Sequence, residues 1–229
     1  VFQYGSIGEE KALALMKCMQ SFKLIMEVYG VERFRACATS AMRDASNGVE
    51  IVKRILAESG IEIDIITGKE EAAIIYDTHM KEAGLDKATR LYVDVGGGST
   101  ELTLYAEGER ILQDSFNVGT IRMMHGSVDQ AVWEEMKAAV KRSVKGLKSL
   151  SVIGSGGNIN KLFSISKVKN NGGLAKVELD AFLKELSGLS VTERMHRYNL
   201  RQERAEVIVP ALQIYTSILK WAAIDSIEV

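Results

Sequence analysis

The first third of the chain alternates between helical and strand-like spacing of its apolar residues. Behind Ser6 and Glu9, which have the S-x-x-E spacing of a capping box, apolar residues recur at helical intervals. The predicted apolar face of this helix comprises Leu15, Met19, Phe22 and Met26. Strands are predicted at 33–39 and 61–66, and helices at 48–59 and 70–82. This order of elements favours the α/β fold class, with helices and sheet in layers.

The rest of the chain begins with strand patterns and ends mainly in helices. Strands are predicted at 91–95, 101–105, 110–118 and 150–153, with a long helix at 129–147. Helices are predicted at 158–166, 177–189 and 202–222, and residues 224–229 have the pattern of a strand. Residues 167–176 are predicted to be a flexible loop. Because the chain has a single proline and no low-complexity linker, its best domain boundary is a compact hinge at 76–89.

The composition indicates an ordinary globular protein without a strong overall charge. Of its 229 residues, 46% are hydrophobic and 26% are charged, and the formal net charge is −1. Any binding of a polyanion must therefore come from local patches. Cys18 and Cys37 lie in apolar stretches and are predicted to be buried thiols in a reducing compartment. No apolar run approaches the ~20 residues needed to cross a bilayer, so a cytoplasmic location is expected.

The stretch LYVDVGGGSTELTLY, at 91–105, carries the strongest sign of chemistry. Three consecutive glycines between two predicted strands let an anion approach the main chain, where successive N–H groups form a concave anion site. The serine and threonine that follow add hydroxyl donors. Asp94 and Glu101 flank the turn and are spaced to share a divalent cation that phosphate oxygens also bind. A plain hairpin is the alternative, and the flanking acids with the hydroxyl pair favour the phosphate site.

Two other stretches place polar groups where elements meet, and each has a simpler explanation. TSAMRDASN, at 39–47, offers the Ser40 hydroxyl and the Arg43 fork to a phosphate, although a helix cap with a surface arginine explains the stretch better by itself. Glu70 and Glu71 begin a predicted helix, where acids complement the helix dipole. One of the two can face a cleft and act as a general base, and the spacing does not say which.

Two further patterns remain open on the residues alone. IGSGGNINKL, at 153–162, is either a tight strand-to-helix turn or a second phosphate loop at a helix N-terminus. Lys137, Lys141 and Lys145 repeat every four residues. This repeat is either a solvated helix face, which is the usual meaning, or a track for an extended polyanion.

Taken together, these stretches resemble the family of exopolyphosphatases and guanosine pentaphosphate phosphohydrolases (Ppx/GppA). The segments ATSAMRDASN, ITGKEEAAIIY, VDVGGGSTEL, FNVGTIRM, GSGGN and RAEVIVP occur in that family's order and span nearly the whole chain. The resemblance implies the fold of acetate kinase, sugar kinases, heat-shock ATPases and actin, in which two ribonuclease-H-like domains enclose a cleft. It implies a first domain at 1–78 and a second domain at 79–229.

The resemblance also implies roles for particular residues. Asp94 and Glu101 would bind Mg²⁺ or Mn²⁺ together with the phosphate, and Glu71 would activate the attacking water. Phosphate contacts are implied for Ser40, Arg43, Gly96, Gly97, Gly98, Ser99, Thr100, Gly156 and Gly157. The chain departs from the family pattern in having Asn158 where threonine is common and Glu206 where aspartate is common.

A larger departure concerns the ends of the chain. The family's N-terminal hairpin, which carries the first domain's phosphate loop, has no counterpart, and neither has its last strand, so the first domain is expected to be incomplete. Val1 is not a methionine, and residues 1–4 read as the continuation of an element, so the natural N-terminus is expected upstream. A protein that truly lacked the hairpin would lose half of its phosphate donors and is expected to be inactive.

The expected function is that of a metal-dependent phosphohydrolase, which removes terminal orthophosphate processively from inorganic polyphosphate. Phosphoryl transfer depends on positioning and charge neutralisation, which the loops, Arg43 and the metal would supply. The alternative substrate is guanosine pentaphosphate (pppGpp), and the basic repeat leans toward polyphosphate. A kinase of the same fold and a non-catalytic polyphosphate or alarmone sensor rank lower, since metal carboxylates and a candidate base are both present. Neither a nucleic acid nor a membrane is expected as a partner, and the resemblance allows a homodimer.

Overall fold

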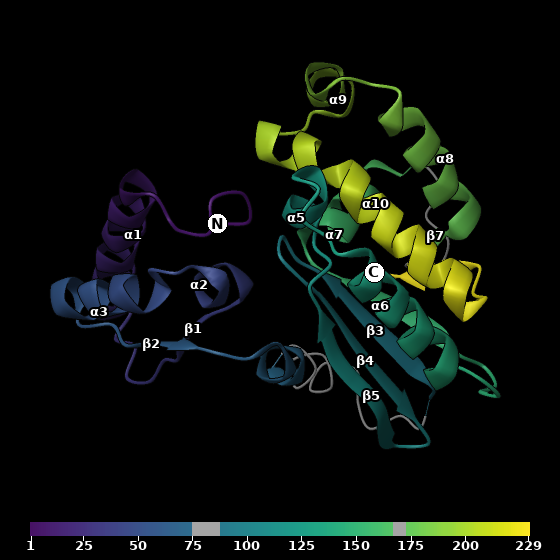
Figure 1. Ribbon diagram of the computed structural model, residues 1–229, viewed down its shortest axis with the longest axis horizontal. Helices are drawn as coiled ribbons and strands as arrows, with labels where there is room; N and C mark the ends of the chain where they lie inside the picture. The colour runs from purple at the N-terminus through teal and green to yellow at the C-terminus, as the bar shows by residue number, and fades with distance from the viewer. Residues whose placement is uncertain (75–87, 167–172) are drawn as a thin grey trace. The chain divides into compact units, whose positions relative to one another are not determined.

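A computed structural model describes residues 1–74, 88–166 and 173–229, which separate into two compact units, Val1–Thr67 and Gly68–Val229 (Figure 1). The predicted boundary between residues 78 and 79 lies outside the described residues. Since the second unit begins at Gly68, the helical residues 68–74, which include Glu71, group with the second unit.

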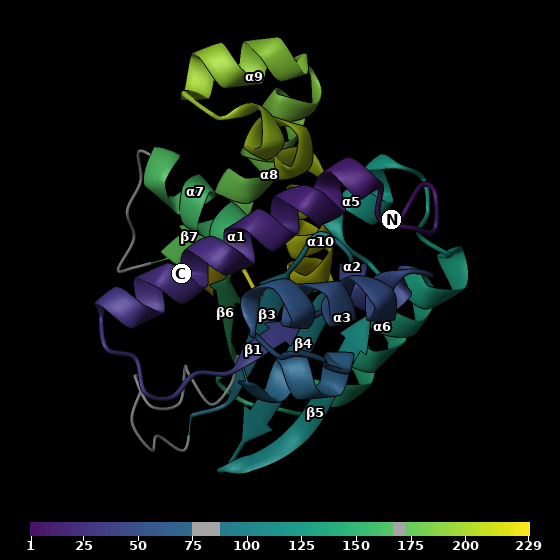
Figure 2. The ribbon, with the colours of Figure 1, turned by 90° about the vertical axis from the view of Figure 1, so that its left-hand side faces the viewer.

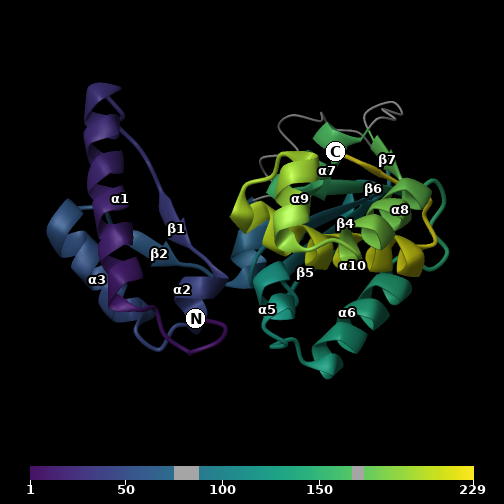
Figure 3. The ribbon, with the colours of Figure 1, turned by 90° about the horizontal axis from the view of Figure 1, so that it is seen from above.

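The first unit is a small α/β layer. It contains α1 (Glu9–Val28), β1 (Ala36–Ala38), α2 (Ser40–Asp44), α3 (Gly48–Ser59) and β2 (Ile63–Ile65). The two strands pair in parallel, and α1 packs beside α3 (Figure 2, Figure 3). Gly60 ends α3 at a φ of +71°, a left-handed conformation that suits glycine. The core of this unit consists of Ala12, Met16, Met42, Ile51 and Ile55.

Two expectations for the first unit are wrong. The N-cap of α1 is Gly8, without a side-chain cap, so Ser6 and Glu9 do not form a capping box. Glu9 is instead paired with Arg54 of α3, with Oε1 and Nη2 2.6 Å apart. Cys18 and Cys37 are exposed and not buried. The reason is that so small a core covers only one side of α1 and of β1.

The second unit is built on one mixed sheet. Its elements are β3 (Arg90–Val95), β4 (Thr100–Ala106), β5 (Glu109–Phe116), α5 (Thr120–Met124), α6 (Gln130–Ser143), β6 (Ser151–Ser155), α7 (Gly157–Ile165), β7 (Gly173–Ala175), α8 (Lys176–Ser187), α9 (Val191–Tyr198), α10 (Gln202–Ala222) and β8 (Ser226–Glu228). The strand order is β5-β4-β3-β6-β8-β7. The strands β3, β4 and β5, which correspond to the strands predicted at 91–95, 101–105 and 110–118, form an antiparallel meander, whereas β6 runs parallel to β3 and β8 parallel to β6.

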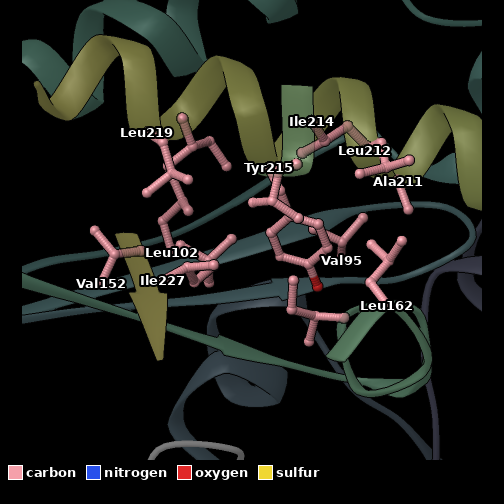
Figure 4. Close-up of a cluster of buried hydrophobic side chains, with 14 of the residues drawn as sticks. Val95, Leu102, Val152, Leu162, Ala211, Leu212, Ile214, Tyr215, Leu219 and Ile227 are labelled. Carbon is pink, nitrogen blue, oxygen red and sulfur yellow. The ribbon is translucent and has the colours of Figure 1, made fainter. Parts of the chain in front are cut away.

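The helix α10 organises the core of the second unit. It packs against β3, α6, α7, α8 and α9 (Figure 1). Its Tyr215 side chain is fully buried beside Val95, and the hydroxyl donates a hydrogen bond of 2.8 Å to the carbonyl of Ser155 at the end of β6 (Figure 4). This bond fastens the last residue of β6, directly before a glycine turn, to the longest helix of the unit.

Three elements among the described residues of the second unit were not predicted. They are α5, α9 and β7, and β7 occupies part of the predicted loop at 167–176, whose residues 167–172 lie outside the described chain. Among the described helices, none combines the length and the apolar character that a membrane crossing requires.

Candidate active site

The predicted strand–glycine–strand unit forms as an antiparallel pair joined by a tight turn. In the register of β3 and β4, Asp94 lies directly opposite Glu101. Directly opposed residues of an antiparallel pair project from the same face of the sheet, with Cβ atoms about 5 Å apart. The two acids predicted to share a metal ion are therefore neighbours on one face.

The carbonyl groups of the glycine turn point toward α5. Those of Gly96 and Gly97 accept hydrogen bonds from the first two N–H groups of α5, over 3.0 and 2.8 Å. The carbonyl of Gly98 accepts a bond of 2.6 Å from Nε of Arg122. Helix α5 and its arginine therefore take up the carbonyl groups of all three glycines, and the N–H group of Gly96 donates a hydrogen bond of 2.9 Å to the carbonyl of Ser99.

The N–H groups of Gly97 and Gly98 have no hydrogen-bond acceptor within the described part of the chain. Successive N–H groups of this kind form the concave donor site that binds anions. The turn is also closely covered, since a Cβ at Gly119 would lie 2.4 Å from the carbonyl oxygen of Gly97. Gly119 therefore allows the start of α5 to rest directly on the turn.

The two hydroxyls after the glycines are engaged within the protein. Thr100 is fully buried, and its Oγ1 donates a hydrogen bond of 2.6 Å to the carbonyl of Val118. Ser99 is also buried, and its hydroxyl hydrogen-bonds the carboxylate of Glu101. Both hydroxyls hold the turn in place, and a direct contact from either to a phosphate stays a prediction.

Glu101 is a buried acid with other acids around it. Its side chain is only 4% exposed, and Oε1 accepts a hydrogen bond of 2.8 Å from Oγ of Ser115. Burial raises the pKa of Glu101 to about 7; the negative charges of Glu71 and Asp94 add to this rise, and the hydrogen bonds from Ser99 and Ser115 oppose it. A cation at this position would stabilise the ionised carboxylate.

The donor set fits a metal that also binds the substrate. Within the described residues, no three His, Cys, Asp or Glu side chains gather into a complete metal site. The pair Asp94 and Glu101 thus offers two carboxylates and leaves further positions for other ligands. This is the arrangement that suits Mg²⁺, which commonly takes one or two carboxylates together with phosphate oxygens and water.

Of the two glutamates at the start of the helical residues 68–74, Glu71 is the one that faces inward. Glu70 is exposed, whereas Glu71 is half-buried and its Oε2 atom is fully buried. The charge of Glu71 acts on the pKa of Glu101, so the two carboxylates lie near each other in the second unit. The candidate base and one candidate metal ligand are therefore brought together.

The second glycine turn lies against Asp94. Ser155, at the end of β6, is the parallel partner of Asp94. The next residue, Gly156, has a φ of +96°, and a Cβ there would lie 2.9 Å from Oδ1 of Asp94. Glycine is required both by this conformation and by the close approach. The two turns predicted to bind phosphate thus meet at Asp94, and Gly157 begins α7 beside them.

A cleft of about 660 Å³ opens between the two glycine turns and the connection from α9 to α10. Its lining includes Gly97, Gly157 and three cationic residues, Lys161, Arg201 and Arg204. Arg204 lies against Gly157, where a Cβ would be 2.5 Å from Nη2, and it hydrogen-bonds the side chain of Asn158.

The cationic residues of this cleft were not predicted from the sequence to be part of the site, although the position of two of them in a helix could have indicated it. Arg201 is the N-cap of α10, and Arg204 lies in the first turn of that helix. The helix dipole disfavours cations at this end, so two arginines there indicate another use, such as binding an anion.

The remaining candidates lie elsewhere. Ser40 begins α2 and is buried, and Nη1 of Arg43 donates a hydrogen bond of 2.8 Å to the carbonyl of Ile66, both within the first unit. Their contacts with a phosphate stay predictions. In the basic repeat, Nζ of Lys137 is paired with Glu134 at 2.7 Å and Lys141 is exposed, whereas Lys145 lies beyond the end of α6 at Ser143. This arrangement fits a solvated helix face.

Comparisons with known proteins find relatives along most of the chain. The chain is 26% identical to the guanosine-5′-triphosphate,3′-diphosphate pyrophosphatase of Aeromonas hydrophila, over 91% of this chain and 45% of that protein. It is 29% identical to exopolyphosphatase 1 of Mycobacterium tuberculosis, over 52% of this chain and 35% of that protein. The chain therefore spans less than half the length of these two curated relatives.

The fold is shared with solved structures. The crystal structure of an exopolyphosphatase from Cytophaga hutchinsonii superimposes with a TM-score of 0.83 at 21% identity, covering 99% of this chain and 80% of that one. This likeness confirms the predicted fold class. The model of the Ppx/GppA phosphatase family matches residues 3–229, and the chain belongs to that family.

Proposed function

We propose that the protein is a metal-dependent phosphohydrolase that releases terminal orthophosphate from inorganic polyphosphate. The observation that carries the proposal is the pairing of Asp94 with Glu101 beside a glycine turn that turns its carbonyls away toward α5. Glu71 lies near this pair. Relatives named as an exopolyphosphatase and as a guanosine-5′-triphosphate,3′-diphosphate pyrophosphatase support the same class of reaction.

Asp94 and Glu101 would hold a divalent cation, Mg²⁺ or Mn²⁺, between them. When bound, such a cation neutralises the charge of the transferred phosphoryl group. The N–H groups of Gly97 and Gly98 would orient that group, and donors aimed in advance at developing charge lower the barrier without reorganising. Glu71 would accept a proton from the attacking water. The cations of the cleft would hold the phosphates that remain.

A second candidate substrate is supported by the shape of the same cleft. Ile121, Leu200 and Val207 give the cleft an apolar part beside its cations. A concave site of mixed apolar and polar lining suits a nucleoside attached to phosphates. Hydrolysis of pppGpp is therefore the alternative reaction. A cytoplasmic location and a homodimer belong to the same proposal and rest on the family resemblance.

The test is orthophosphate release by the full-length protein from long-chain polyphosphate and from pppGpp, each with Mg²⁺ and with EDTA. We expect metal-dependent release, faster from polyphosphate. Glu71→Gln should lower kcat by about a hundredfold or more, because it removes the general base, and should keep polyphosphate binding. The matched control is Glu70→Gln, which changes the exposed neighbour and should leave kcat unchanged.

Three outcomes would count against the proposal. A wild-type protein that binds both substrates and hydrolyses neither would be a sensor and not an enzyme. Phosphate release that is equally fast with EDTA and with Mg²⁺ would show that the reaction does not require a divalent metal. Wild-type turnover in Glu71→Gln would remove that glutamate from the mechanism.

A further inference from the structure

Strand β5, at the edge of the sheet next to β4, contacts the candidate site through three consecutive residues. Nε2 of Gln113 donates a hydrogen bond of 2.8 Å to the carbonyl of Lys69, and Nζ of Lys69 lies 3.9 Å from Oδ1 of Asp114. Ser115 is the direct cross-strand partner of Glu101 and donates the hydrogen bond of 2.8 Å to its Oε1. The strand therefore contacts both a candidate metal ligand and the start of the helical residues 68–74.

The closest of these contacts is between Ser115 and Gly68. A Cβ at Gly68 would lie 2.3 Å from Cβ of Ser115 and 2.4 Å from its Oγ, so the main chain of Gly68 rests directly on the serine side chain. Real Cβ atoms do not approach so closely, and the pair fits only because residue 68 is glycine. Glu71 follows three residues later, about one helical turn from this contact.

We propose that Ser115 is a positioning residue that acts on two parts of the site. Its hydroxyl orients Glu101 for the metal, and its Cβ sets how closely the segment that carries Glu71 approaches. This inference rests on the proposed function for the roles of Glu101 and Glu71. The hydroxyl oxygen takes part in both contacts and the Cβ only in the contact with Gly68, so removing the hydroxyl alone keeps the Cβ contact.

The first substitution is Ser115→Ala, which removes the hydroxyl and keeps the Cβ. We expect Mn²⁺ affinity, measured by EPR titration without substrate, to fall about tenfold, because a charge-assisted hydrogen bond to a ligand carboxylate is lost. At saturating Mg²⁺, kcat should stay within a few-fold of wild type. Ser115→Cys, which keeps a weak donor, should give an intermediate affinity. The matched control is Ser143→Ala, because the Ser143 hydroxyl donates its hydrogen bond to the carbonyl of Ala139 within α6.

The second substitution is Gly68→Ala, which places a methyl group against Ser115. We expect kcat to fall at least tenfold, because a small displacement of a catalytic group is costly, and Mn²⁺ affinity to be kept. The double variant Gly68→Ala with Ser115→Gly removes the clash. It should recover part of the lost kcat and show the weakened Mn²⁺ binding of Ser115→Ala. Urea denaturation of each variant checks that the variant is folded under the conditions of the assays.

The outcomes distinguish this inference from the function on which it rests. Wild-type Mn²⁺ affinity in both Ser115→Ala and Ser115→Cys would overturn the role of the hydroxyl. A double variant no faster than Gly68→Ala would overturn the role of the Cβ contact. If the wild-type protein releases no phosphate from either substrate, the proposed function fails, while the Mn²⁺ titrations still decide whether Ser115 orients a metal ligand.

Discussion

Glu101 is a carboxyl group buried beside two other acids, and its titration has a consequence for stability. Burial and the neighbouring charges raise its pKa from 4.5 to about 7 in the folded protein. Because the folded value lies above the unfolded one, the protonated carboxyl contributes stability that is complete below about pH 4.5 and is lost as the pH rises through 7. Without a cation, the ionised group is therefore a cost to the fold at neutral pH.

We expect Glu101→Gln to stabilise the metal-free protein more at pH 8 than at pH 5, by on the order of 2 kcal/mol in the free energy of unfolding. Glutamine keeps the size and the acceptor oxygen and removes the charge. Urea denaturation in EDTA at both pH values measures the difference, with the exposed Glu10→Gln as control. An equal effect at the two pH values would show that Glu101 is not titrating between them.

Gly119 is a residue whose lack of a side chain shapes the phosphate turn. A Cβ there would meet the carbonyl oxygen of Gly97 at 2.4 Å and the carbonyl carbon of Gly98 at 2.5 Å, and main-chain atoms cannot move aside cheaply. We expect Gly119→Ala to displace the turn and to lower phosphate release at least tenfold. Gly188→Ala is the control, because φ is −81° and the nearest atom lies 3.5 Å away. Equal activity of the two variants would contradict the close packing of α5 on the turn.

At the scale of elements, local sequence patterns predicted the strands of the site. They did not predict α5 or the cationic cleft, which form through contacts between distant parts of the chain. The alternation in β3 and β4 and the short turn between them determine the register, so the pairing of Asp94 with Glu101 follows from their spacing. The five-residue helix α5 has no such pattern, since it forms where the glycine turn accepts its first N–H groups. The cations of the cleft come from α7 and from the start of α10, and only the fold brings them together.

Capping shows why a short motif needs its context. Ser6 and Glu9 have the spacing of a capping box, yet Gly8 is the cap of α1. The capping box that forms is Ser190 with Glu193, at the start of α9. That helix was missed because it is only eight residues long and mostly polar, although Val191, Met195 and Tyr198 recur at helical spacing.

The attachment of α10 to β6 is a contact between elements that can be tested alone. Tyr215 is fully buried, and its hydroxyl satisfies the carbonyl of Ser155 just before the second glycine turn. Tyr215→Phe keeps the ring and leaves the part-buried carbonyl of Ser155 without this donor, so we expect a loss of about 1–2 kcal/mol in the free energy of unfolding. Tyr29→Phe, at a site 79% exposed, should change it by less than about 0.5 kcal/mol. Urea denaturation of both variants makes the comparison.

At the scale of the molecule, the two units differ in how much core each possesses. In the first unit the strands are three residues long, and several large apolar side chains of α1 remain exposed, among them Phe22, Leu24 and Ile25. In the second unit a six-stranded sheet is covered by α10, whose inner face is buried along most of its length. Since local stability follows buried apolar contacts, the units should open with different free energies.

We therefore expect the amides of α1 and β1 to exchange with deuterium faster than those of β3 and β4 in the 229-residue chain. Hydrogen exchange followed by mass spectrometry, at constant pH and without divalent cations, measures these exchange rates directly. Adding Mg²⁺ with orthophosphate should slow exchange further around Asp94 and Glu101, because a ligand that binds only the folded site stabilises it. Equal protection of the two units would mean that they open together, and protection unaltered by the additions would mean that the two carboxylates bind no metal–phosphate pair.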